Sequence, residues 1–146
     1  IVDNIDCFFF FFGEFLIIHD WKRPWRITGN SSVYRFKLGA FPDLLPYFRK
    51  HFDEIRQKFR NEQAYLSWFV NEHGTLTYWN DTWCKSYKYH CLQKIPLAYF
   101  KPPVKPEGAK IIIFHGEINP PDAVNGGGGK WYRYVLPSDW IKEAWQ

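Results

Sequence analysis

The 146-residue sequence contains no methionine. It begins with IVDNID, and residues 1–20 lack the basic start, the sustained apolar run and the small-residue cleavage site of a signal peptide. We therefore expect the chain to be a fragment of a longer reading frame. Its length suits one domain with a substantial core, and we predict a single domain over residues 1–146.

Long apolar runs are also absent. The run FFFFF at residues 8–12 is closed by Gly13 and Glu14, and it falls well short of the roughly 20 residues that cross a bilayer. We predict no transmembrane segment. We interpret the run as a buried segment, with a contact to a membrane surface or a partner as the alternative.

Cysteine is scarce. Cys7, Cys84 and Cys91 are too few for a disulfide framework, and the last two have six residues between them. Zinc-binding pairs are usually two to four residues apart. We expect reduced, partly buried thiols in a reducing compartment. A cytoplasmic location follows as a prediction, with peripheral attachment to a membrane as the alternative.

The excess of positive charge is small, because 19 basic residues stand against 15 acidic ones. The basic residues are scattered along the chain, and a nucleic-acid binder would need them clustered on one face. We therefore predict no nucleic-acid partner. Aromatic residues are plentiful instead, at 21% with 8 tryptophans. This richness suits a non-catalytic carbohydrate-binding module, which is the rival of the function derived below.

Apolar patterns along the chain predict an α/β layer fold, because strand-like and helical segments alternate. The predicted strands cover residues 13–20, 31–39, 75–80 and 111–116, with the tail of another strand at 1–6. The predicted helices cover most of 41–74, with a second helix from about Asn61 to His73, and 138–145, with Ser138 as its cap. Loops are expected at 21–30 and 101–108, and NGGGG (125–129) is flexible by composition.

Three polar groups follow strands or begin helices, where ligands bind in open α/β sheets. They are GNSS at 29–32, NEQ at 61–63 and His115-Gly116. Taken singly, they suit a turn, the solvated first turn of a helix and a structural histidine. Taken together, they suit a nucleotide-sugar site, which needs hydrogen-bonding groups for hydroxyls, a divalent cation for the diphosphate and close approach of the main chain.

Four blocks of the sequence resemble GT-A glycosyltransferases related to glycogenin and the bacterial galactosyltransferases. GNSSVYRFKLG (29–39) resembles one of their strands, and RNEQAYLSW (60–68) resembles the start of a sugar-contacting helix. SYKYHC (86–91) followed by IIIFHGEINPPDAV (111–124) resembles a bacterial and viral branch in which SYK-x-HC precedes FHG-x-x-K-P. The resemblance covers about residues 1–145. It implies a GT-A-like mixed sheet flanked by helices, whose amino-terminal part, including a metal-binding Asp-x-Asp, lies upstream of Ile1.

The resemblance implies roles on the sugar side of the site. Asn30 and Ser31 match residues that face the donor sugar, and Ser32 stands in place of the usual Gly. Glu62 and Gln63 match a pair that contacts the sugar near the reaction centre, so they are the catalytic candidates. Ala64 stands where related members often carry a second Asp, and that contact is missing here.

On the phosphate side, Gly116 matches the terminal motif, but Asn119 replaces its phosphate-binding Lys. Lys88 is our candidate for the lost phosphate contact. The metal-binding His of related members falls at Ile113, and His115 lies two residues further on the same side of the strand. The resemblance therefore makes His115 the candidate ligand of a divalent metal, Mn²⁺ or Mg²⁺.

The loop WKRPWR (21–26) is a further candidate. Trp21 and Arg23 are suited to stacking on a sugar or holding a phosphate, although tryptophans that only pack on the sheet would give the same sequence.

These observations predict a metal-dependent glycosyltransferase that moves a sugar from a nucleotide-diphosphate donor to a saccharide-like acceptor. We expect Asn30, Glu62 and His115 to converge on one cleft, and the present chain alone to have little activity. A carbohydrate-binding module would need no diphosphate site, so nucleotide binding separates the two functions.

Overall fold

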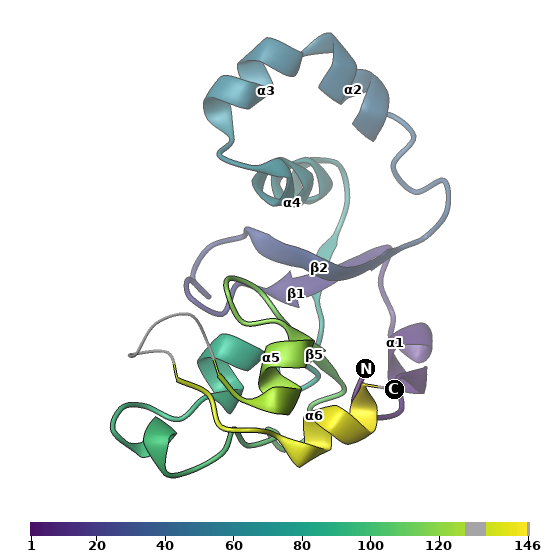
Figure 1. Ribbon diagram of the computed structural model, residues 1–146. Coiled ribbons are helices and arrows are strands. Elements are labelled where there is room, and N and C mark those ends of the chain that lie inside the picture. The colour runs from purple at the N-terminus through teal and green to yellow at the C-terminus, as the bar shows by residue number, and fades with distance from the viewer. Residues whose placement is uncertain (128–133, 146) are drawn as a thin grey trace. The chain divides into compact units, whose positions relative to one another are not determined.

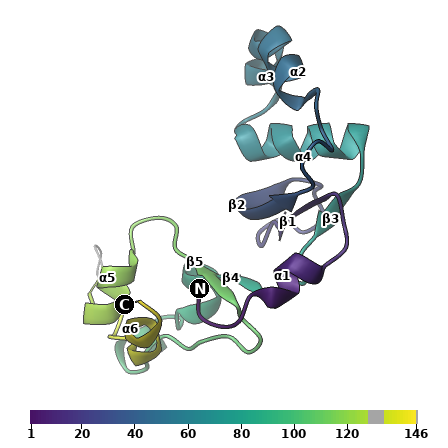
Figure 2. The ribbon, with the colours of Figure 1, turned by 90° about the vertical axis from the view of Figure 1, so that its right-hand side faces the viewer.

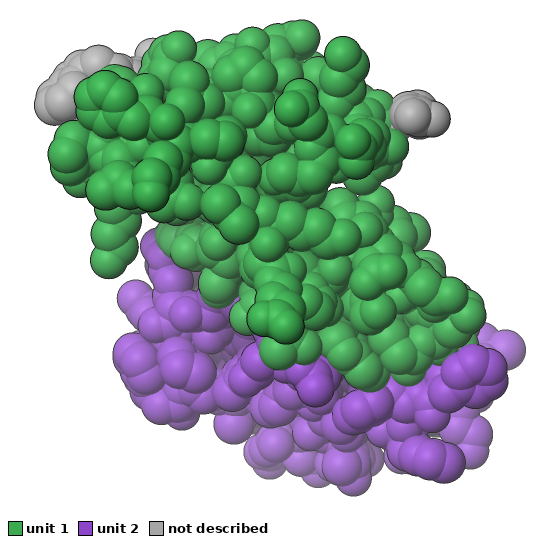
Figure 3. Space-filling model, turned by 90° about the horizontal axis from the view of Figure 1, so that it is seen from below, with its two compact units in different colours: residues 1–9, 82–146 green, residues 10–81 purple. Residues whose placement is uncertain are grey.

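The computed structural model describes residues 1–127 and 134–145 (Figure 1). The chain divides into two compact units, one formed by residues 1–9 and 82–146 and the other by Phe10–Asp81, which Figure 3 shows in separate colours. Each unit has its own small sheet. The fold is mixed α/β, as predicted, and the single domain over residues 1–146 stays a prediction.

The sheet of unit 2, Phe10–Asp81, has three strands in the order β2-β1-β3. They are β1 (Phe15–His19), β2 (Gly29–Phe36) and β3 (Leu76–Tyr78), which confirms the strands predicted in these regions. β2 runs antiparallel to β1, whereas β3 runs parallel to it. The first residues of β2 therefore lie beside the carboxyl end of β1, where Ile18 pairs with Asn30 and His19 with Gly29.

Helices cover one side of this sheet. α4 (Glu62–His73) packs on it through Val70, which contacts Phe15 and Ile17 in a buried cluster. α2 (Leu44–Lys50) and α3 (Phe52–Lys58) form the next layer (Figure 2). The predicted helical region is confirmed, but its first part is interrupted at His51, whose φ of −113° and ψ of 28° are not helical.

Gly29 is required by close packing at the start of β2. A Cβ atom at this position would lie 2.6 Å from Ile17 Cγ2 and 2.9 Å from the carbonyl oxygen of Ile18. Both neighbours belong to the buried strand β1, so neither can move away cheaply.

We therefore expect Gly29→Ala to lower the free energy of unfolding by about 1–3 kcal/mol, the usual range for overpacking a core. Urea unfolding followed by tryptophan fluorescence measures this change. Ser32→Ala, on an exposed residue of the same strand, is the matched control and should stay within about 0.5 kcal/mol of the wild type. Equal midpoints for the two variants would contradict the steric argument.

The other unit, unit 1 (residues 1–9 and 82–146), is built on two short parallel strands, β4 (Cys84–Ser86) and β5 (Ile111–Ile113). A π-helix, η1 (Tyr87–Cys91), follows β4 directly, and a 3-10 helix, η2 (Leu97–Tyr99), comes next. α5 (Pro120–Asn125) and α6 (Asp139–Ala144) complete the unit. Its core contains Tyr87, Cys91, Ala109, Ile112, Ile118, Ala123, Val135 and Ile141.

Several predictions in this unit need correction. The predicted strand at 111–116 ends at Ile113, and α5 was not predicted, although prolines suit the first turn of a helix. α6 is confirmed with Ser138 at its N-cap position, but in the described chain the Ser138 hydroxyl makes no capping hydrogen bond and is buried. Of the NGGGG segment, residues 128 and 129 lie outside the described residues.

The amino-terminal segment also differs from the prediction. Residues 1–6 do not end a strand, because α1 (Asp6–Phe10) begins at Asp6. Phe8 is buried against Trp83, with ring centroids 5.2 Å apart, whereas Phe9, Phe10 and Phe12 are 66%, 79% and 93% exposed. A helical turn sends successive side chains in different directions, so the whole run cannot be buried on one side. Among the described residues, no helix is long and apolar enough to span a bilayer.

The described residues contain free cysteines and no disulfide, in line with the prediction of reduced thiols. Burial raises the pKa of the Cys84 and Cys91 thiols to about 12, whereas Cys7 is half-buried. We expect iodoacetamide at pH 8 to label Cys7 well before Cys84 and Cys91, because the thiolate is the reactive form. Mass spectrometry over time gives the three rates, and full unfolding in urea should equalise them. Similar rates in the folded protein would contradict the burial of the two sites.

Candidate functional site

A polar cluster joins the start of β2 to the start of α4. The Ser31 hydroxyl donates a hydrogen bond to Glu62 Oε1 at 2.9 Å, and the Ser31 N–H donates to Gln63 Oε1 at 3.3 Å. These residues come from two of the motifs named above, more than 30 positions apart. The fold therefore brings Ser31, Glu62 and Gln63 into direct contact.

Ser67, one turn further along α4, connects the start of β2 to the first turn of this helix. Its hydroxyl is fully buried, accepts the Gly29 N–H at 2.9 Å and donates to the Gln63 carbonyl at 2.7 Å. The N-cap Asn61 accepts the Ala64 N–H at 3.1 Å and so fixes the first turn of α4. Asn30 Oδ1 accepts the Ser32 N–H at 2.9 Å, which leaves the side-chain amide NH₂ of Asn30 as its donor group.

The WKRPWR loop starts at the same edge of this sheet, directly after β1. Its backbone forms a turn in which the Arg23 N–H donates to the Asp20 carbonyl at 3.3 Å. The Tyr78 hydroxyl, from the end of β3, donates to the Ile27 carbonyl at 2.7 Å and anchors the loop. Trp21 is half-buried and Arg23 is exposed, so both the packing and the ligand-binding interpretations remain predictions.

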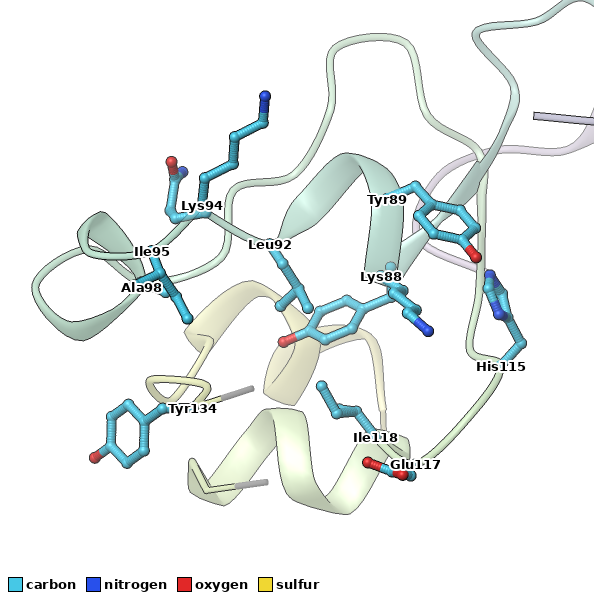
Figure 4. Close-up of a pocket in the computed structure, with 12 residues that line it drawn as sticks. Lys88, Tyr89, Leu92, Lys94, Ile95, Ala98, His115, Glu117, Ile118 and Tyr134 are labelled. Carbon is cyan, nitrogen blue, oxygen red and sulfur yellow. The ribbon is translucent and has the colours of Figure 1, made fainter. Parts of the chain in front are cut away.

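In unit 1, a pocket of about 480 Å³ opens beside η1 and the segment after β5 (Figure 4). Lys88, Tyr89 and His115 lie at one end of it, and Ile95, Ala98 and Tyr134 lie at the other. The predicted phosphate and metal residues Lys88 and His115 therefore share one pocket. Among the described residues, the lining consists of Tyr87, Lys88, Tyr89, Leu92, Gln93, Lys94, Ile95, Ala98, His115, Glu117, Ile118 and Tyr134.

His115 is held by the strand next to its own. β4 and β5 are parallel, with Ser86 paired to Ile113, so Ser86 lies near the point where the chain leaves β5. Ser86 Oγ and His115 Nε2 lie 2.6 Å apart and are hydrogen-bonded. The same hydroxyl accepts the Tyr89 N–H at 3.3 Å as the side-chain cap of η1. The imidazole is thus fixed relative to the first turn of η1.

Lys88 lies next to the main chain at Gly116. Gly116 has a φ of +95°, which favours glycine, and a Cβ atom there would lie 4.0 Å from Lys88 Nζ. The Tyr89 ring is close to both candidates, 5.7 Å from Lys88 Nζ and 5.1 Å from the His115 ring. A cation, an imidazole and an exposed glycine turn therefore meet at the carboxyl end of β5.

Asn119 has a structural role. It precedes α5, and its backbone N–H donates a hydrogen bond to Asp122 Oδ2 at 2.9 Å, as in a capping box. In the described structure it is not one of the residues that line the pocket. Its predicted contact to substrate stays a prediction. Tyr89, Glu117 and Ile118 do line the pocket and were not named from the sequence, where no motif singled them out.

His115 could supply one ligand to a metal ion, but the residues described around it do not make a complete metal site. Among the described residues, no group of three or more His, Cys, Asp and Glu side chains could hold a metal ion. A ligating histidine usually donates its other N–H to a partner that orients it. Ser86, whose Oγ is hydrogen-bonded to His115 Nε2, would be such an orienting partner for His115.

The two candidate clusters belong to different units. Ser31, Glu62 and Gln63 lie in unit 2, and Lys88, His115 and Gly116 lie in unit 1. The convergence of Asn30, Glu62 and His115 on one cleft therefore stays a prediction.

Comparison of the chain with protein-family models, with curated proteins and with solved structures finds no match.

His90 contacts Ser86, the residue that holds His115 at the pocket. Its Nδ1 lies 3.0 Å from the Ser86 backbone nitrogen, whose N–H it can accept, and 3.3 Å from the Ser86 carbonyl oxygen. Burial, and secondly the positive charge of Lys85, lower the pKa of His90 below its ordinary value of 6.5. Folding therefore favours the neutral imidazole over the protonated one at this position.

Since the pKa of His90 is lower in the folded protein than in the unfolded chain, the unfolded chain binds a proton at His90 first as the pH falls. The contribution of the neutral His90 to the free energy of unfolding is complete above pH 6.5 and is lost as the pH falls through the lowered folded pKa. We expect the free energy of unfolding of wild type to decrease between pH 7.5 and pH 5, and to decrease less in His90→Gln. Urea unfolding at four pH values measures this difference. His51→Gln, on a histidine between α2 and α3, is the control, and an equal pH slope in both variants would contradict the assignment.

Proposed function

We propose that the chain is the carboxyl-terminal part of a GT-A-like glycosyltransferase, which moves a sugar from a nucleotide-diphosphate donor to a saccharide-like acceptor. The observation that supports this most is the meeting of Lys88, His115 and Gly116 at one end of a pocket. These are groups that a diphosphate needs. Gly116 is the one that the GT-A resemblance matches directly, and Lys88 and His115 are our substitutes for the Lys and His that related members carry at the positions of Asn119 and Ile113.

The phosphate end would act through fixed charge. Departure of the nucleotide leaves negative charge on its diphosphate, and a cation that is already in place stabilises that charge as it develops. Lys88 supplies the cation, and Gly116 lets main-chain atoms approach a phosphate oxygen without a side chain in the way. Ser86 keeps the His115 ring in a defined orientation. A bound Mn²⁺ or Mg²⁺ would neutralise diphosphate charge, and His115 is the residue here that would hold it.

The sugar end would act through directed hydrogen bonds. Glu62 and Gln63 carry a carboxylate and an amide, which bind hydroxyls in fixed directions. The contact with Ser31 orients both side chains at the start of α4. In this role Glu62 would also stabilise positive charge on the sugar carbon during transfer.

A non-catalytic carbohydrate-binding module is the second candidate. The exposure of aromatic side chains favours it, since Trp25 is 77% exposed and could stack on a sugar. Such a module has no use for a phosphate-binding end. Binding of a diphosphate therefore decides between the two functions.

We expect inorganic pyrophosphate to bind the 146-residue chain, and Lys88→Gln to lower its affinity about tenfold or more, as for the loss of one charged hydrogen bond. His115→Ala should weaken only the part of the affinity that Mn²⁺ adds. Isothermal titration calorimetry with and without Mn²⁺, at constant ionic strength, separates the two effects.

Lys94→Gln is the matched control, because Lys94 lines the same pocket but its ammonium points away from the Lys88 end (Figure 4). It should bind pyrophosphate like wild type. Equal losses in Lys88→Gln and Lys94→Gln would indicate unspecific attraction by net charge. Equal affinity in wild type and His115→Ala, both dependent on Mn²⁺, would return His115 to a structural role.

A further inference from the structure

The pocket extends well beyond its Lys88–His115 end. Away from this end, much of the lining is apolar: Leu92, Ile95, Ala98 and Ile118 (Figure 4), together with the ring of Tyr87. A diphosphate held at Lys88 would leave this apolar region unused. The region therefore requires an explanation of its own.

The floor of the pocket is preformed, because it belongs to the core of the unit. Tyr87 and Ile118 are 1% and 7% exposed and lie in one buried cluster, against which Leu92 packs. The Tyr87 ring is stacked on Phe114, with centroids 4.5 Å apart. These side chains cannot rearrange without disturbing the core, so the shape of the floor is fixed before a ligand binds.

The lining also contains polar groups. They are the Gln93 amide, the Glu117 carboxylate, and the hydroxyls of Tyr89 at the Lys88 end and of Tyr134 at the other end (Figure 4). A pyranose ring has a matching division, with an apolar face of C–H groups and hydroxyls around its edge. An alkyl chain would leave the polar groups unused. The volume of about 480 Å³ lies within the usual range of small-ligand pockets.

We propose that the apolar part of this pocket binds a pyranose ring, with its C–H face on Leu92 and Ile118 and its hydroxyls bonded to Gln93 and Glu117. That this ring is the acceptor sugar rests on the proposed function. A ring in this position lies beside the Lys88 end, so one of its hydroxyls would approach the bond between the donor sugar and the diphosphate. Binding of the ring itself requires no diphosphate.

The test blocks the apolar part of the pocket and leaves its phosphate end unchanged. Ile95 lines the pocket and is 46% exposed, so Ile95→Trp adds an indole there with little strain on the core. Leu97→Trp is the matched control, since Leu97 is 44% exposed, two residues away, and is not one of the described lining residues. Saturation-transfer NMR with the methyl glycosides of glucose, galactose, mannose, rhamnose and N-acetylglucosamine measures sugar binding.

We expect at least one glycoside to bind wild type and Leu97→Trp equally, and to lose at least tenfold in affinity in Ile95→Trp. Pyrophosphate should bind Ile95→Trp like wild type, so failure of this inference and failure of the phosphate site are told apart. Absence of binding by all five glycosides, or equal binding by the two tryptophan variants, would overturn the proposal. So would a loss of uridine diphosphate affinity in Ile95→Trp with pyrophosphate unaffected, because the pocket would then hold a nucleoside.

Discussion

The pocket depends on the hydrogen bonds of one buried residue, Ser86. Its hydroxyl bonds to His115 Nε2 at 2.6 Å and accepts the N–H of Tyr89, while its own N–H donates to His90 Nδ1. Ser86 is fully buried, so these bonds are not weakened by competition with water. The end of β4, the first turn of η1 and the segment after β5 are thereby fixed to one another. Lys88 and His115 can face the same space because of this connection.

η1 is a π-helix, and Ser86, whose hydroxyl accepts the Tyr89 N–H, is its N-cap. η1 spans the five residues that follow Ser86, and the Leu92 N–H donates to the Tyr87 carbonyl at 3.2 Å, in the wider turn of a π-helix. This turn buries Cys91 in the core, places Tyr87 in both the core and the pocket floor, and leaves Lys88 and Tyr89 to line the pocket. Burial of the Cys91 thiol raises its pKa to about 12, so the residue acts as a small apolar side chain. The π-turn thus supplies core residues and pocket-lining residues within five positions.

The parts of the structure that sequence reasoning predicted are those with a strong periodic pattern. α4 carries both an N-cap Asn61 and a terminating Gly74, and β1 is a short apolar run, so both were predicted within one or two residues. η1 has no such pattern, because a wide turn places buried residues at an unfamiliar spacing. The burial of FFFFF was wrongly predicted, since composition cannot show that a helical turn exposes Phe9 and Phe10 and that Phe12, just beyond it, is exposed too. Motifs identified Lys88 and His115, but Glu117 and Ile118 enter the pocket only through the turn at Gly116.

The candidate phosphate-binding groups and the candidate sugar-positioning groups lie in different units, so the two functions can be tested separately. Lys88, His115 and the entire described pocket lining lie in one unit, so binding of a phosphate or a sugar there requires only the folding of that unit. The Ser31–Glu62–Gln63 cluster is likewise complete within the other. In the proposed function, transfer of a sugar would require both sets of groups to act on one donor, because the leaving diphosphate and the sugar carbon are joined by a single bond. Loss of transfer with phosphate binding intact would therefore locate a defect in the sugar-positioning groups or in the joining of the two sets.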